Sequence, residues 1–241
     1  MRALSVIKSG KSKFFLIMGI VGLIAIFVGF AKPFIIPVAQ QTFEAPLSIY
    51  IHGALSLAWV LFFTIQSSLI HVKNYKLHIR MGFAGIFLAL ATSLSLHPVA
   101  KFVVERDLKL GLGEMAYSNS ISLLTTGLMF LLLVGFAIYY RRESTIHNRL
   151  LLLATIVLLW PAWFRFRHFF PNVPRPEIWF GLVLSDSLII IAWIWDKISN
   201  KKVHPALLYP GIAIIVEQTI EVFLYDSPIW RTVGKLLYEI L

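Results

Sequence analysis

The chain has 241 residues, of which 58% are hydrophobic and only 14% are charged, and its mean hydropathy is +0.79. An ordinary soluble domain carries about 25% charged residues, so the composition predicts a polytopic membrane protein without a separate soluble domain. Cysteine is absent, which excludes disulfides, thiolate nucleophiles and cysteine metal sites. The net charge of +10 does not indicate nucleic-acid binding, because the basic residues lie mostly in short loops, where they set topology and meet anionic headgroups.

Seven apolar stretches predict an all-α helix bundle over residues 1–241. Several of them are near or slightly under the ~20 residues that cross a bilayer. They cover residues 14–30, 49–70, 80–99, 121–140, 150–164, 178–195 and 207–225. The first follows a basic head but is longer than the ~7–15 apolar residues of a signal peptide. We expect it to be retained, with cleavage near Ala39 as the alternative. Pro161 predicts a kink or an extension of the fifth span, and residues 228–240 predict an amphipathic helix along the interface.

Lysine and arginine are more frequent in the segments that lie on the same side of the membrane as the amino terminus than in the segments on the other side. The positive-inside rule then places the amino end inside and the carboxyl end outside. Arg165, Arg167 and His168 depart from this rule, because they follow the fifth span on the outer side. They are either snorkelling side chains at a helix end, an anion-facing rim, or counter-charges to buried acids.

Three acids lie within predicted spans, where a charge costs ~2.5–3.5 kcal/mol at the helix centre. Asp186 is in the sixth span, and Glu217 and Glu221 share one face of the seventh. On the second span, His52, Ser56, Trp59, Phe63 and Gln66 follow the helical period and share a face. The candidate ligand or proton site therefore comprises His52, Gln66, His97, Arg165, Asp186, Glu217 and Glu221. The equal alternative is a buried polar network that only holds helices together.

Several basic residues mark the inner ends of spans, where loops become helices. This predicted inner-face polar cluster comprises His78, Arg80, His147, Arg149 and His204. We interpret these residues as interfacial caps or contacts to anionic lipid headgroups, with a cytoplasmic ligand or metal site as the alternative.

A single haem b or a metal ion is a further alternative, because His52 and His97 match in depth on antiparallel neighbours. A two-haem arrangement fails. His52 to His71 and His78 to His97 are both nineteen residues apart, so each pair spans ~28 Å and reaches both membrane faces. No cofactor is required by the sequence.

The pattern His52, Trp59, Gln66, His78, Arg80, Gly82 resembles a family of uncharacterised bacterial multi-pass membrane proteins. The resemblance continues through His147-Asn-Arg149, Pro161-Ala162 with Arg165, Asp186 and His204-Pro205, and covers most of residues 49–206. It implies a bacterial inner-membrane location and emphasises His52, Gln66, His78, Arg80, His147 and Asp186, but it supplies no reaction.

The leading functional hypothesis is a protein that binds or translocates a small ligand, proton or cation through the polar site in the outer half of the bundle. The alternatives are a membrane redox or metal-binding protein that uses His52 and His97, and a structural scaffold.

Overall fold

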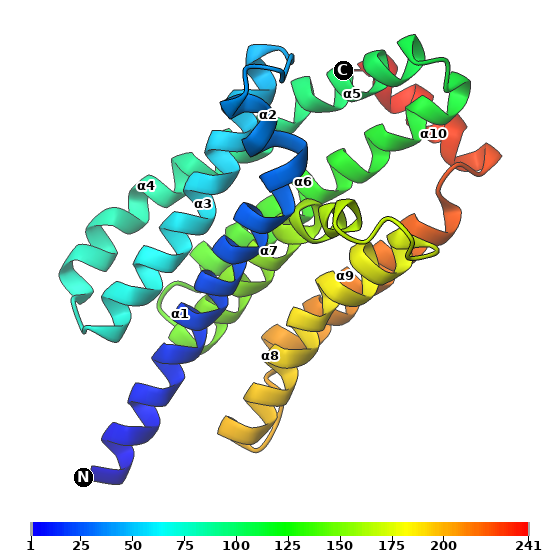
Figure 1. The fold of residues 1–241 in the computed structure, drawn as a ribbon. Helices are drawn as coiled ribbons and strands as arrows, with labels where there is room; N and C mark the ends of the chain where they lie inside the picture. The colour runs from blue at the N-terminus through cyan, green and yellow to red at the C-terminus, as the bar shows by residue number, and fades with distance from the viewer. Residues whose placement is uncertain (1, 241) are drawn as a thin grey trace.

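Figure 1 shows the computed structural model, which describes residues 2–240, with side chains from residue 13 onward, as an antiparallel bundle of helices. Seven segments of this described chain are long and apolar enough to cross a membrane. They are Lys13–Ala39, Leu47–His71, Tyr75–Lys109, Gly113–Tyr139, Ser144–His168, Glu177–Asn200 and Pro205–Leu224. The all-α polytopic bundle with seven spans is therefore confirmed.

Several of these spans are composite helices. The chain runs through α1 (Arg2–Phe30), η1 (Ala31–Ile35), α2 (Ile36–Ala39), α3 (Leu47–His71), α4 (Tyr75–Leu94), α5 (Leu96–Lys109), η2 (Gly113–Tyr117), α6 (Ser118–Tyr139), α7 (Ser144–Phe164), η3 (Arg165–His168), η4 (Glu177–Leu184), α8 (Ser185–Asn200), α9 (Pro205–Leu224) and α10 (Pro228–Ile240). The first span is longer than residues 14–30, because η1 and α2 continue α1. The third is longer than residues 80–99, because α4 and α5 are separated only by Ser95.

Helix α7 forms the centre of the bundle. The buried share of its most apolar window is 61%, against at most 33% for every other described span. Leu152, Leu153 and Ala154 are buried in succession, so α7 is covered all round, whereas the other spans keep large apolar side chains on their outer faces. An apolar outer face is what a helix in lipid requires. The helix continues through Pro161 and is extended by the 3-10 turn η3, so the extension expected at this proline occurs.

Helix α1 packs very closely on two neighbours through glycines. A Cβ at Gly19 would collide with Thr64 of α3, and a Cβ at Gly29 would collide with the Ala162 carbonyl of α7. Small residues permit such close approach between helices in membranes, where dispersion contacts replace the hydrophobic effect as the driving force.

The two ends of the bundle differ in construction. We call the end with the turns at residues 72–74, 140–143 and 201–204 the turn end, and the opposite end, with η1, α5 and η3, the α10 end (Figure 1). Helix α10 coincides with the amphipathic helix expected over residues 228–240. It packs on α6, where Ser120 Oγ donates to Gly234 O at 2.8 Å. Its position along a membrane interface, like the orientation of the whole bundle, stays a prediction.

Candidate functional site

Three acidic side chains lie on the neighbouring helices α8 and α9. Asp186 of α8 is 5% exposed. The carboxyl group of Glu217 on α9 interacts with it electrostatically. Glu221 lies one turn further along α9, on the same face as Glu217. Thr125 Oγ1 of α6 donates to Glu221 Oε1 at 2.5 Å. We call Asp186, Glu217 and Glu221 the carboxyl cluster; the structure places these three predicted site residues on the adjoining helices α8 and α9.

The local helical structure explains this placement. Glu217 and Glu221 are four residues apart, so they lie on one face of α9. Asp186 follows the π-helical segment η4 directly, and π-helical turns recur at functional sites. Ser185 and Gln218 adjoin the cluster in sequence, and Ser185 Oγ and Gln218 Oε1 are buried without a hydrogen-bond partner in the described part of the chain.

The carboxyl cluster lacks positive partners. Among residues 13–240, both Asp186 oxygens are buried without a hydrogen-bond partner, as is Glu217 Oε1, and the ion pairs found there involve other acids. The same residues contain no group of three or more His, Asp or Glu side chains arranged to hold a metal ion.

His52 occupies a separate polar group at the junction of α4 and α5. Its Nδ1 lies 2.8 Å from Ser95 Oγ and its Nε2 lies 3.4 Å from Ser56 Oγ. Ser95 donates its only hydroxyl proton to Thr92 O at 2.6 Å. It must therefore accept from His52, which places the imidazole proton on Nδ1. Arg165 is the charged residue that interacts electrostatically with this ring.

Two predicted site residues lie apart from His52. His97 is exposed on α5, while both nitrogens of His52 are engaged by serine hydroxyls, so the structure does not pair the two histidines as haem ligands would pair. Gln66, which the sequence grouped with His52, lies near the turn end. The His78 ring contacts the Gln66 backbone there, and both side-chain amide atoms of Gln66 are buried without partners in the described chain.

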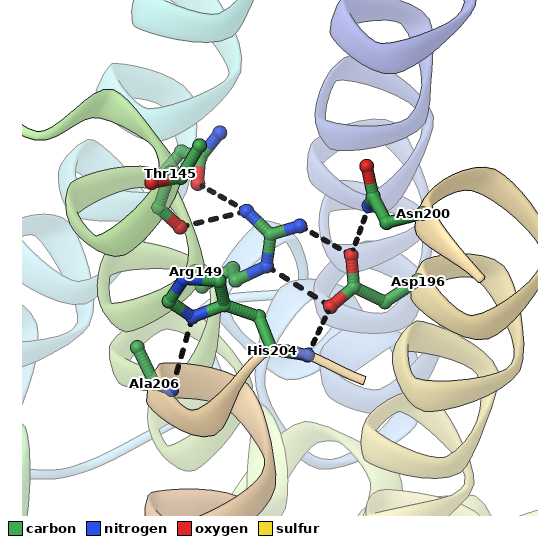
Figure 2. Close-up of polar contacts among 7 residues, drawn as sticks. Thr145, Arg149, Asp196, Asn200, His204 and Ala206 are labelled. Carbon is green, nitrogen blue, oxygen red and sulfur yellow. Dashed lines mark hydrogen bonds and ion pairs between the residues drawn. The ribbon is translucent and has the colours of Figure 1, made fainter. Parts of the chain in front are cut away.

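Figure 2 shows the buried network at the turn end. Arg149 of α7 and Asp196 of α8 form an ion pair whose side chains are 6% and 0% exposed. Asp196 also accepts from Asn200 Nδ2 at 2.5 Å and from the His204 backbone N–H at 2.7 Å. Arg149 NH1 donates to Thr145 O at 2.7 Å. This network joins α7, α8 and the start of α9, so its contacts are structural.

His204 caps α9 in this network. Burial lowers the pKa of His204 below its usual value, which favours the neutral imidazole. A neutral ring has one accepting nitrogen, and Nδ1 accepts from the Ala206 backbone N–H at 3.1 Å. His204 therefore has the helix-capping role that the sequence predicted.

The remaining inner-face residues do not join one cluster. His147 Nδ1 lies 2.7 Å from Ala137 O, where α6 ends beside the start of α7. His78 lies near His147, whereas Arg80 is exposed on α4. The predicted inner-face cluster therefore divides: Arg149 and His204 belong to the Arg149 network, whereas His78, His147 and Arg80 lie outside it.

Sequence reasoning missed Asp196 and Thr125 as partners. Asp196 ends an apolar run beside Trp195, and this position resembles an ordinary loop acid. Its one signal is that Arg149 occupies a similar depth on another span. Thr125 has no signal, because hydroxyl side chains are common in apolar helices, where they bond to their own backbone.

Comparison with protein-family models, with curated proteins and with solved structures found no match to this chain. The resemblance to a bacterial membrane-protein family therefore stays a prediction.

Proposed function

We propose that this multi-pass membrane protein binds or carries protons, or a small monovalent cation, through the carboxyl cluster. The observation that supports the proposal best is Asp186, whose two carboxyl oxygens are buried without partners among the described residues; the carboxyl group of Glu217 is within electrostatic range of it. An unpaired acid inside an apolar bundle costs free energy unless it takes up a proton or a cation.

The contacts of Glu221 provide a connection between the helices of the site. Thr125 Oγ1 of α6 donates a hydrogen bond to Glu221, and Glu217 lies one turn away from Glu221 on the same face of α9. Glu217 in turn acts on Asp186 of α8. A proton taken up at one carboxyl can therefore be shared along three groups on two helices. A purely structural network would leave fewer acceptors without donors.

Orientation and location belong to the same proposal. The turn end presents the exposed basic residues Lys73, Lys76, Arg80, Arg141, Arg142, Lys197, Lys201 and Lys202. This surplus supports a cytoplasmic turn end that meets the anionic headgroups of a bacterial inner membrane.

The test is proton flux into liposomes that contain the purified protein, driven by a potassium diffusion potential and followed with an enclosed pH dye. We expect flux above that of empty liposomes, and at least a tenfold loss in Asp186→Asn and in Glu217→Gln. Glu177→Gln is the matched control, because the Glu177 side chain is 37% exposed and pairs with Arg175.

The infrared carbonyl band of protonated carboxyl groups gives a second readout on the same samples. We expect this band in the native protein at neutral pH and a smaller band in Glu217→Gln. A native protein with neither flux nor this band would leave the carboxyl cluster with a structural role only.

A further inference from the structure

Four basic side chains gather at the α10 end of the bundle, where η1 meets η3. We call Lys32, Arg165, Arg167 and His168 the basic rim. Lys32 Nζ of η1 donates to the backbone carbonyl of His168 in η3 at 3.1 Å. The charges that act on His168 are those of Arg167, Arg165 and Lys32, and all three are positive.

No acid neutralises this group within residues 13–240. The ion pairs found there involve Arg106, Arg149, Arg175 and Arg231. The basic rim instead contacts aromatic faces: the Arg165 guanidinium lies 4.2 Å from the centre of the Phe30 ring. The sequence hypothesis that these cations counter the buried acids therefore has no ion pair to support it.

Most hydrogen-bond donors of the two arginines remain unused. The structure gives Arg165 one hydrogen bond, from NH1 to Pro161 O at 2.8 Å, and Arg167 one, from NH1 to Phe164 O at 3.1 Å. A guanidinium has five N–H donors in a planar fork. Each arginine therefore keeps donors in the geometry that suits bidentate binding of an oxyanion.

We propose that the basic rim binds a phosphate group. Like charges held together repel one another, and an oxyanion between them would remove that repulsion while using the free donors. Arg165 and Arg167 are half-buried, whereas Lys32 and His168 are exposed, so the rim is reachable from the surface. The phosphate belongs either to a lipid headgroup at the membrane boundary or to a free anion. This inference does not depend on the carboxyl cluster.

The experiment measures thermal unfolding of the purified protein in a neutral detergent, followed by tryptophan fluorescence. One arm adds sodium phosphate against sodium chloride at equal ionic strength. The other adds dihexanoyl phosphatidylglycerol against dihexanoyl phosphatidylcholine. The test variant is Arg165→Gln with Arg167→Gln, and the matched control is Arg141→Gln with Arg142→Gln, a neighbouring pair at the turn end.

We expect a saturable rise in the unfolding midpoint and at least a tenfold weaker apparent affinity in the test variant, because two charge-assisted contacts are lost. A rise with phosphatidylglycerol alone identifies a headgroup, and a rise with inorganic phosphate identifies a free anion. Lys32→Gln with His168→Gln, both exposed, weakens binding by roughly threefold and covers the case in which the first variant fails to fold. No rise with either ligand, or an equal loss in the control pair, overturns the proposal.

Discussion

Arg149 and Asp196 are paired inside the bundle although 47 residues separate them, with Arg149 Nε donating to Asp196 Oδ2 at 3.1 Å. The second Asp196 oxygen is bonded to Arg149 NH2 and Asn200. Because the carboxylate also binds the backbone N–H of His204, one acid fixes the contact of α7 with α8 and the turn into α9.

Removal of one member of this pair is expected to destabilise the fold strongly. Arg149→Met leaves Asp196 buried and unpaired, which typically costs about 3–5 kcal/mol. Chemical denaturation in mixed micelles measures the loss. Arg175→Met is the control, since its pair with Glu177 is exposed and worth at most about 1 kcal/mol. Adding Asp196→Asn to Arg149→Met should recover part of the stability; equal denaturation midpoints for Arg149→Met and the native protein would contradict a structural role.

The crossing of α1 with α7 gives a second prediction. Gly29→Ala places a methyl group against the Ala162 carbonyl, and overpacking of this kind costs about 1–3 kcal/mol. Gly135→Ala is the matched control, because a Cβ there meets nothing within 4 Å. We expect the thermal midpoint to fall for Gly29→Ala and to stay level or rise for Gly135→Ala. A fall of similar size in both would show that the close approach is not the cause.

Thr125→Val tests the hydroxyl group that supports the carboxyl cluster. The change keeps the shape of the side chain but removes the donor to Glu221, which should cost about 1–3 kcal/mol. Thr219→Val is the comparison, because the Thr219 hydroxyl bonds only to Ile215 O of its own helix. Unfolding free energies of the two variants decide the point; if Thr219→Val loses as much as Thr125→Val, the contact with Glu221 contributes nothing specific.

The start of α10 should respond to acid. Two hydrogen bonds from Arg231, 2.7 Å and 2.9 Å long, hold the pKa of Asp226 below its usual value. The pair therefore stabilises the folded state fully above the unfolded pKa of about 3.9, and this contribution is lost as the pH falls through the lower folded pKa. Trp230 fluorescence between pH 6 and pH 2 follows the change.

Asp226→Asn is the control for this acid response. Asp226 has a positive φ of 65°, which asparagine tolerates, so the backbone should be retained while the titration disappears. High salt should also weaken the exposed pair. An acid response that is unchanged in Asp226→Asn would assign it to another group.

The seven spans were predictable because hydropathy reports directly whether a helix can lie in lipid. The length of the third span was not, because α5 carries Lys101, Glu105 and Arg106 and its apolar face is narrow. Its continuation depends on packing against α6, where Asn119 Nδ2 donates to Asp107 Oδ2 of α5 at 2.9 Å.

The candidate site was predictable only in part. Depth along each helix placed Asp186, Glu217 and Glu221 in one half of the bundle, and the structure has them on the adjoining helices α8 and α9. Depth also suggested that His97 and His52 could be ligands of one site. In the structure His97 is exposed on α5, and the His52 ring contacts Ser95. Helix rotation depends on all neighbours at once, so a single sequence fixes position along an axis far better than position around it.

The Arg149–Asp196 pair has a consequence for biogenesis. Each of the two helices alone would bring an uncompensated charge into the lipid, whereas together they bring a neutral pair. Since α7 and α8 are consecutive, the translocon can release them as one hairpin whose two charges have already met. A nascent chain whose translation is arrested after α7 should therefore stay incompletely integrated into the membrane until Asp196 has been synthesised.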